Sequence, residues 1–208
     1  EDGLKEVYSK FFNPLKNTYN FFQLYANTDH IDMDECKVAY EDLEEIDKWL
    51  LSKYHNLLKY VTESYDEYDL NKVVKAITNF VSEDLSNWYI RRNRSRYWGN
   101  ELNNSKKAVY STTYEVLVGV CKMIAPVIPY LSEELYRNLT GEESVHLAYF
   151  PKYNTEYIDL KLEEKMDTVR TLISIGRNVR EEAKIKVREP LSECLLNADS
   201  KDLISDLK

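Results

Sequence analysis

The sequence predicts a mainly α-helical protein, folded as an antiparallel helical bundle. Apolar residues recur at steps of three and four along most of the 208 residues, which is the spacing of one face of a helix. Only 5 glycines and 5 prolines occur, too few for an all-β sandwich with a turn every 8–12 residues or so. Hydrophobic residues make up 43% of the chain, enough for a folded core.

The apolar spacing divides the chain into helical segments joined by short links. They are expected over residues 11–22, 42–65, 70–98, 106–124, 132–140 and 162–179. Helices of these lengths with short links fit a bundle of four or five antiparallel helices.

Capping residues support several of these boundaries. Asp69 or Asn71 is expected to cap the helix that continues to residue 98, and Ser132 the helix that follows the two prolines of residues 125–129. Gly141 stands where that helix should end. Gly176 lies on the apolar face of the last helix and predicts a close approach by another helix there.

The pattern changes after residue 183. Ile185 and Val187 alternate with charged residues, and Pro190 interrupts the run, which is typical of a strand or an extended link. We therefore expect a helical-bundle domain over residues 1–183, followed over 184–208 by an extended link and the start of a small α/β element.

The formal net charge is −8, but the charged residues are distributed unevenly along the chain. Residues 29–69 hold 13 acids and 4 bases, whereas residues 91–107 hold six bases and one acid, and residues 170–188 hold six bases and two acids. Eight of the nine arginines lie in the two basic windows, although lysine is the commoner cation elsewhere. The planar fork of arginine suits phosphate recognition and stacking. A solvated basic face, or pairing with the acidic segment, is the other interpretation.

The sequence contains no motif for a metal site, a catalytic centre or a membrane span. The three cysteines are far apart with no CxxC, and the three histidines share no neighbourhood with them, so we expect no metal site and reduced thiols in a cytoplasmic protein. No nucleophile elbow or phosphate-binding glycine loop occurs, and we expect no catalytic residue and no cofactor in this chain. No apolar run approaches the roughly 18 residues of a membrane span.

Several stretches together resemble the isoleucyl-tRNA synthetases, in the region that follows their catalytic domain. They are residues 13–27, 85–99, 124–136, 143–151 and 180–191. The proline-containing stretch 124–136 fits several class I synthetases of the valine, leucine and isoleucine group. The Trp-Tyr-Ile-Arg-Arg run at 88–92 and the Ile-Lys-Val-Arg-Glu-Pro-Leu run at 185–191 are typical of the isoleucine enzymes.

The resemblance implies an anticodon-binding domain of helical-bundle type. The parent enzymes join isoleucine to tRNA(Ile) using ATP and Mg²⁺, and they hydrolyse mischarged valine in a separate editing domain. Their ATP-binding signatures, His-Ile-Gly-His and Lys-Met-Ser-Lys-Ser, do not occur here. We therefore expect a non-catalytic piece of a longer synthetase. Its expected partners are tRNA(Ile) and the catalytic and editing domains of the same chain, with neither DNA nor a membrane.

The first basic window supplies the expected RNA contacts. Phosphate contacts are expected from Arg91, Arg92, Arg94 and Arg96, helped by Lys106 and Lys107, with Tyr97 or Trp98 stacking on a base or sugar. Trp88 falls on an apolar helix face and is expected in the core. A possible second basic face consists of Arg177, Arg180 and Lys184.

Two alternatives stay open. The chain is an interdomain scaffold in which the basic windows dock another domain or the acidic segment, or it is the anticodon-binding domain of a valine enzyme.

Overall fold

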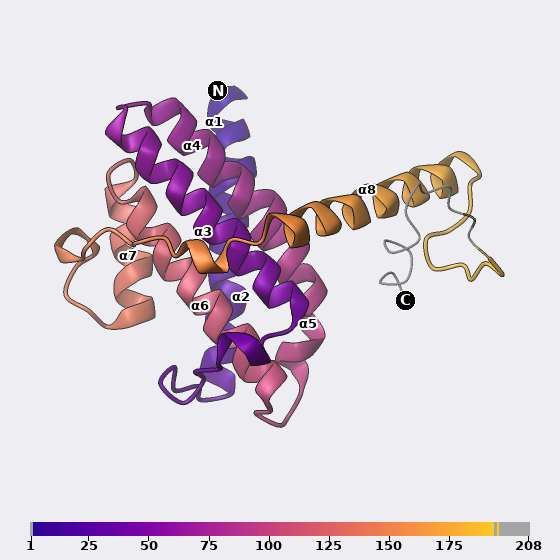
Figure 1. Cartoon of the computed structure of the whole chain (residues 1–208), viewed down its shortest axis with the longest axis horizontal. Helices are drawn as coiled ribbons and strands as arrows, with labels where there is room; N and C mark the ends of the chain where they lie inside the picture. Colours follow the sequence, from indigo (N-terminus) through magenta and orange to yellow (C-terminus); the bar gives the residue numbers. More distant parts are fainter. Residues whose placement is uncertain (1, 194, 196–208) are drawn as a thin grey trace. The chain divides into compact units, whose positions relative to one another are not determined.

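The computed structural model describes residues 2–193 and 195, and these are helical almost throughout (Figure 1). The elements are α1 (Asp2–Val7), π-helix η1 (Tyr8–Phe12), α2 (Asn13–Thr28), 3₁₀ turn η2 (Tyr40–Asp42), α3 (Glu45–Asp66), α4 (Leu70–Asn79), π-helix η3 (Phe80–Ile90), α5 (Arg91–Trp98), α6 (Asn104–Ile124), α7 (Pro129–Thr140), 3₁₀ turns η4 (Val145–Leu147) and η5 (Thr155–Tyr157), and α8 (Leu160–Glu182). No β-strand occurs among the described residues. The mainly helical prediction is confirmed.

Local capping chemistry sets where the main helices begin. Asp69 accepts a hydrogen bond from the backbone of Lys72 at the start of α4, as expected. Glu44 and Asp47 form a reciprocal capping box at the start of α3, and the Asn103 side chain caps α6. Each cap satisfies backbone N–H groups that have no partner inside the helix.

The start of α7 differs from the prediction. Its first residue is Pro129 rather than a residue after Ser132, since a proline at the first helical position lacks only an N–H that would be unpaired anyway. Ser132 lies within the first turn, where its hydroxyl donates to the Pro129 carbonyl. Gly141 ends the helix at φ +71°, a left-handed conformation that glycine adopts without steric cost.

The core is formed where α3, α6 and the α4–η3–α5 run pack together with α2 (Figure 1). Its largest fully buried side chains include Trp49 and Leu50 from α3, Leu85 and Tyr89 from η3, and Leu117 from α6. Because these residues repeat at helical spacing, the sequence pattern identifies the buried faces of the bundle.

Gly119 permits a close approach between two helices of the bundle. A Cβ atom at Gly119 would lie 2.5 Å from Cζ of Tyr54, so the tyrosine of α3 crosses α6 where no side chain stands. No described atom lies within 4 Å of the position of a Cβ at Gly176 in α8. The close approach expected at Gly176 stays a prediction.

The chain divides into two compact units, with the boundary after Ile158. Helix α8 thus belongs with the C-terminal unit, whereas the sequence pattern placed residues up to 183 with the bundle. After α8, residues 184–193 form turns and irregular backbone with no strand. The rest of the expected α/β element lies outside the described residues.

Candidate nucleic-acid interface

Helix α5 carries an exposed stripe of basic and aromatic side chains. Arg91, Arg94 and Trp98 are three and seven residues apart, so they lie on one face of the helix. All three are exposed, and the Trp98 side chain is 59% accessible. The opposite face buries Asn93 and Tyr97. We call the three residues Arg91, Arg94 and Trp98 the α5 face.

Two arginines of this run lie over aromatic rings. The guanidinium carbon of Arg92 is 5.2 Å from the centre of the Trp88 ring, and that of Arg94 is 5.9 Å from the centre of the Phe21 ring. Trp88, expected in the core, is half-buried. Cation–π contact supports the plane of a guanidinium and leaves its edge N–H groups directed outward for a phosphate.

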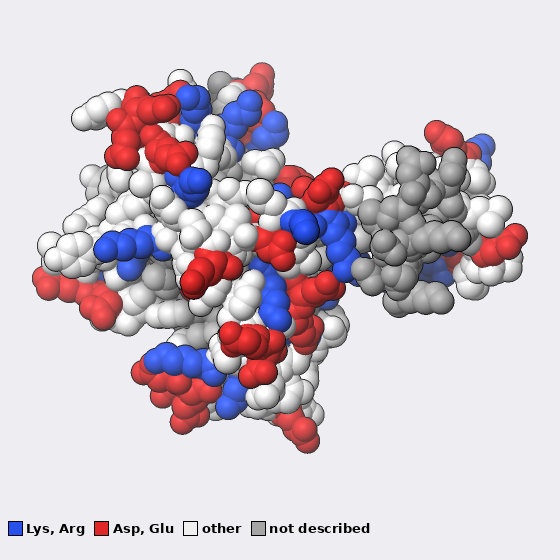
Figure 2. Space-filling view, viewed as in Figure 1, with Lys and Arg blue, Asp and Glu red and all other residues white. Residues whose placement is uncertain are grey.

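Four bases of the first window have no ion pair with any described residue: Arg91, Arg92, Arg94 and Lys107. Their charges are therefore available to an anionic partner. On the face seen in Figure 2, acidic and basic side chains are interspersed rather than gathered into one large field. Any RNA contact thus depends on a few positioned groups more than on the total charge of the surface.

Arg96, expected to contact RNA, is committed to the interior instead. Its side chain is 10% exposed, and its two terminal nitrogens reach the two carboxylate oxygens of Asp47 at 2.7 and 2.8 Å. The same guanidinium donates to the hydroxyl and the carbonyl of Ser105. Burial opposes the charged form, but the bond to Asp47 outweighs it and the pKa of Arg96 is raised. A guanidinium with all these partners has no free edge for a phosphate.

Tyr97 is likewise a core residue and not a stacking platform. It is 1% exposed, and its hydroxyl lies 2.7 Å from that of Thr113. Its ring meets the edges of Phe21 and Tyr110. Burial raises the pKa of Tyr97 well above its ordinary value. Of the two aromatic candidates, Trp98 alone offers a free ring face.

Lys106 is also withdrawn from the surface. It is 3% exposed, and its ammonium lies 2.6 Å from a carboxylate oxygen of Asp29 and donates to the carbonyl of Gly99. Tyr110 donates to the same carboxylate. Burial opposes ionisation of Asp29, but the hydrogen bonds from Lys106 and Tyr110 outweigh it and lower its pKa. The interpretation that the basic window pairs with the acidic segment is therefore correct for Arg96 and Lys106.

The chain matches a known family over most of its length. Residues 47–195 match the family described as the anticodon-binding domain of tRNA ligase. The chain belongs to this family of anticodon-binding domains. The matched range includes α5 and the link that leads from it to α6, so the α5 face lies in the part of the domain that defines the family.

Several curated relatives of this anticodon-binding domain are isoleucine–tRNA ligases. The chain is 42% identical over 201 residues to the isoleucine–tRNA ligase of Cytophaga hutchinsonii, which covers 94% of this chain and 18% of that protein. It is 41% identical over 206 residues to the isoleucine–tRNA ligase of Clostridium novyi, and the match covers 96% of this chain and 20% of that protein. It is 42% identical over 194 residues to the isoleucine–tRNA ligase of Chlamydia trachomatis serovar L2, and the match covers 92% of this chain and 18% of that protein. The domain thus spans about a fifth of the length of these relatives.

The second basic window lies in the C-terminal unit. Arg177 and Lys184 are exposed, and Lys184 has a left-handed backbone with φ +56°. Arg180 donates to the carbonyls of Lys186 and Glu189 and closes the turn that follows α8. Neither Arg177 nor Lys184 pairs with an acid of residues 2–193, while Arg180 is largely occupied by its own chain.

Among the described residues, no group of three or more histidine, cysteine or acidic side chains is placed to hold a metal ion. No described helix is long and apolar enough to cross a membrane.

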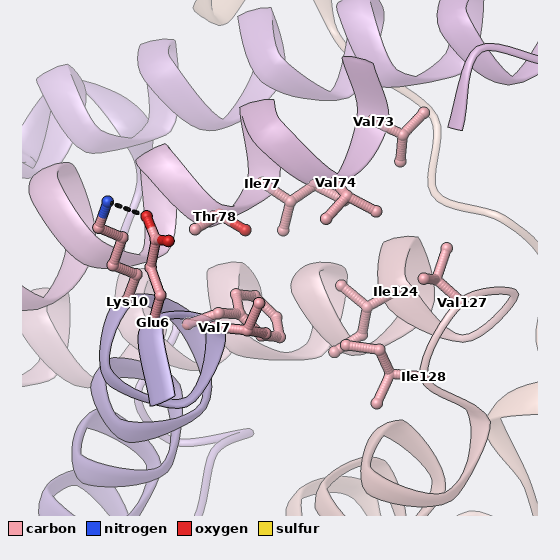
Figure 3. A pocket seen from close by; sticks show the side chains of 11 residues that line it. Glu6, Val7, Lys10, Val73, Val74, Ile77, Thr78, Ile124, Val127 and Ile128 are labelled. Carbon is pink, nitrogen blue, oxygen red and sulfur yellow. Dashed lines mark hydrogen bonds and ion pairs between the residues drawn. The ribbon is translucent and has the colours of Figure 1, made fainter. Parts of the chain in front are cut away.

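A groove in the surface of the bundle has a volume of about 170 Å³ and apolar walls (Figure 3). An ion pair between Glu6 and Lys10 lies at its rim. Val7 of α1 and aliphatic side chains of α4 face those at and just after the end of α6 across it, including Val74, Ile77 and Ile128. Such walls suit nonpolar side chains and offer nothing to phosphates.

Two residues that hold the basic window together have no signal of their own in the sequence. Asp47 and Asp29 are two of the 13 acids in the segment 29–69, and nothing local distinguishes them from the exposed ones. Asp47 falls beside the apolar stripe of α3 and is completely buried. The position of Asp47 beside an apolar helix face is the one sequence feature that could have indicated its burial.

Proposed function

We propose that this domain binds the anticodon stem-loop of tRNA(Ile) as part of an isoleucine–tRNA ligase. The observation that carries the proposal is the α5 face, where exposed arginines without ion pairs stand next to an exposed tryptophan. The family to which the chain belongs and the names of its relatives agree with this function.

The chemistry of the α5 face suits a single-stranded RNA loop. Arginine forks bind phosphates in two-pronged fashion and supply affinity and register. Unstacked loop bases are read along their edges and stack on aromatic rings. We assign phosphate contacts to Arg91, Arg92, Arg94 and Lys107, and base or sugar stacking to Trp98. Arg177 and Lys184 are a possible second basic face.

In the parent enzyme, other domains carry out the chemistry. ATP and Mg²⁺ belong to the catalytic domain, which joins isoleucine to tRNA(Ile) in the cytoplasm, and the editing domain removes valine. The role of this domain is to hold the tRNA so that its acceptor end reaches those sites. Specific binding of the anticodon loop supplies the positioning energy.

Substitutions in the full-length synthetase test this function. Arg91→Gln, Arg92→Gln and Arg94→Gln together should raise KM for tRNA(Ile) by about tenfold or more, because each lost phosphate contact involves a charged hydrogen bond. ATP–pyrophosphate exchange, which needs no tRNA, should be unchanged. Lys59→Gln, Lys75→Gln and Lys152→Gln remove three exposed bases elsewhere and are the matched control. Unchanged tRNA kinetics in the arginine variant would refute the proposal.

The valine alternative needs its own measurement. Competition between tRNA(Ile) and tRNA(Val) transcripts for the full-length protein separates the two, since an isoleucine enzyme should bind tRNA(Ile) more tightly. Equal or reversed preference would favour the valine enzyme.

The apolar groove favours a second, compatible function as a docking surface for the rest of the synthetase. Val74 is 42% exposed and Val127 is 38% exposed at its walls, and apolar surface of this kind is normally covered. Val74→Asp in the full-length synthetase should then increase proteolysis between domains while leaving the tRNA affinity of this domain unchanged. If the domain were an interdomain scaffold that does not bind RNA, the arginine variant should leave KM for tRNA(Ile) unchanged.

A further inference from the structure

Two buried bases tie together the two sides of the link between α5 and α6. Arg96, before the link, donates to the carbonyl of Ser105 beyond it at 2.6 Å. Lys106, beyond the link, donates back to the carbonyl of Gly99 at its start. The two bonds run in opposite directions and enclose residues 99–105. We call this arrangement the α5–α6 clasp.

Each base of the clasp is anchored by an acid from another helix. Arg96 pairs with Asp47 near the start of α3, and Lys106 pairs with Asp29 at the end of α2. The clasp therefore joins α5 and α6 to two helices that come much earlier in the chain. A turn held at both ends by buried ion pairs keeps one conformation.

The clasp lies on the same short helix as the α5 face. Trp98 directly precedes Gly99, and Arg94 is two residues before Arg96. Helix α5 forms the last 8 residues of the continuous α4–η3–α5 run, and the end of a helix frays unless other contacts hold it. The orientation of its exposed side chains thus depends on what holds its C-terminal end.

We propose that Arg96 and Lys106 are positioning residues for RNA recognition, which hold Arg94 and Trp98 in the arrangement that binds the anticodon loop. This rests on the proposed function. The two bases touch no RNA. They act through the clasp, because a preorganised surface loses less conformational entropy when it binds.

The test replaces one ion pair by a neutral pair of similar shape in the full-length synthetase. Asp29→Asn with Lys106→Met removes both charges and the bond to Gly99 but leaves no unpaired buried charge, so stability should change little. We expect KM for tRNA(Ile) to rise about fivefold, with ATP–pyrophosphate exchange unchanged. Amide hydrogen exchange should increase in residues 99–105 and stay constant in residues 112–124.

A matched control removes a buried hydrogen bond at another place in the bundle. Tyr65 donates to the carbonyl of Met123 at 2.8 Å, and Tyr65→Phe deletes this bond with almost no change of shape. It should leave KM for tRNA unchanged. If Tyr65→Phe raises KM as much as the clasp variant does, the effect is general destabilisation and the positioning role is refuted.

A double-mutant cycle distinguishes this proposal from the proposed function. If the clasp acts through the α5 face, combining the clasp variant with Arg94→Gln and Trp98→Ala should weaken binding no more than the face variant alone. Fully additive effects on KM would refute the positioning role of the clasp and leave the proposed function unaffected. The same conclusion would follow if the clasp variant had a normal KM while the face variant had a raised KM. Normal KM in both variants would refute the function.

Arg96→Lys provides a second route should the neutral pair fail to fold. Lysine keeps the charge opposite Asp47 but cannot reach Asp47 and Ser105 together, since it lacks the fork of arginine. It should also raise KM for tRNA(Ile) and leave ATP–pyrophosphate exchange intact. A folded Arg96→Lys protein with normal KM overturns the proposal.

Discussion

Arg96 and Asp47 meet in a buried two-pronged ion pair across 49 residues of sequence, with nitrogen–oxygen distances of 2.7 and 2.8 Å. The hydroxyl of Tyr89 donates to the same carboxylate at 2.5 Å. Asp47 is fully buried, so its charge is compensated by these neighbours and by the backbone N–H of Glu44 in the capping box. The pair fixes the C-terminal end of α5 against the start of α3. One arginine of a run of four thus serves the fold while its neighbours face outward.

Asp47→Asn should destabilise the domain strongly. The substitution leaves the Arg96 charge buried without its carboxylate, which typically costs about 3–5 kcal/mol. Urea denaturation followed by circular dichroism measures the change. Replacing both partners, by Asp47→Leu and Arg96→Met, should recover most of the loss. Asp34→Asn, which breaks an exposed pair with Lys37, is the control and should leave the midpoint where it was.

Gly119→Ala should destabilise the contact between α3 and α6. The new methyl group would collide with the ring and hydroxyl of Tyr54, and overpacking of a buried contact costs about 1–3 kcal/mol. Thermal unfolding measures it. Tyr54→Leu in the same chain should relieve part of the penalty. Gly99→Ala, where no atom lies within 4 Å, should be tolerated, and an equal loss at both glycines would contradict the steric explanation.

Salt should weaken tRNA binding by an amount set by the bases that have no ion pair. With Arg91, Arg92, Arg94 and Lys107 on phosphates, log K should fall with log salt concentration at a slope of about −3. Each of these bases changed to glutamine should reduce the slope by about 0.8. Fluorescence anisotropy of a labelled tRNA between low and physiological salt gives the slopes. Lys106→Met should not lower the slope, because its ammonium is paired with Asp29.

Stability should fall as the pH is lowered from about 6.5 towards 4. Burial lowers the pKa of His55 to about 4, below its ordinary value, and its Nδ1 accepts a hydrogen bond from the backbone of Asn154. In this range the unfolded chain binds a proton that the folded chain excludes, so the loss grows by up to about 1.4 kcal/mol per pH unit. Urea titrations at several pH values measure it.

His55→Asn should flatten that pH dependence, because an amide oxygen accepts the same bond and does not titrate here. Glu115, whose carboxylate lies 3.7 Å from Nε2 of His55, contributes with the opposite sign. Partial burial raises its pKa, so its protonation favours the folded state as the pH falls. Glu115→Gln should therefore make the slope steeper. If neither substitution changes the dependence of the unfolding free energy on pH, another group causes it.

Much of the fold was predictable because helix formation depends on near neighbours. The apolar spacing in residues 42–65 and 106–124 identified α3 and α6 to within a few residues, and Asp69 and Gly141 marked real helix ends. The sequence pattern predicts a start of α7 that is too late, because a proline usually ends a helix, whereas Pro129 occupies the first helical position.

The candidate interface is predictable from the sequence only as a region. Composition identified the window 91–107, and helical spacing separates the exposed Arg91 and Arg94 from the buried Tyr97. Spacing does not reveal that Arg96 and Lys106 are neutralised, because Asp47 and Asp29 lie in distant segments.

The sequence by itself determined a helical bundle with its charge polarised between an acidic and a basic segment, since both properties are local. Only the tertiary structure decided which bases remain available to RNA. An ion pair forms when two groups come within a few ångströms in a poorly solvated place, and the packing of α2 and α3 against α5 and α6 selects those pairs. The same packing that buries Arg96 leaves Arg91 and Arg94 in solvent.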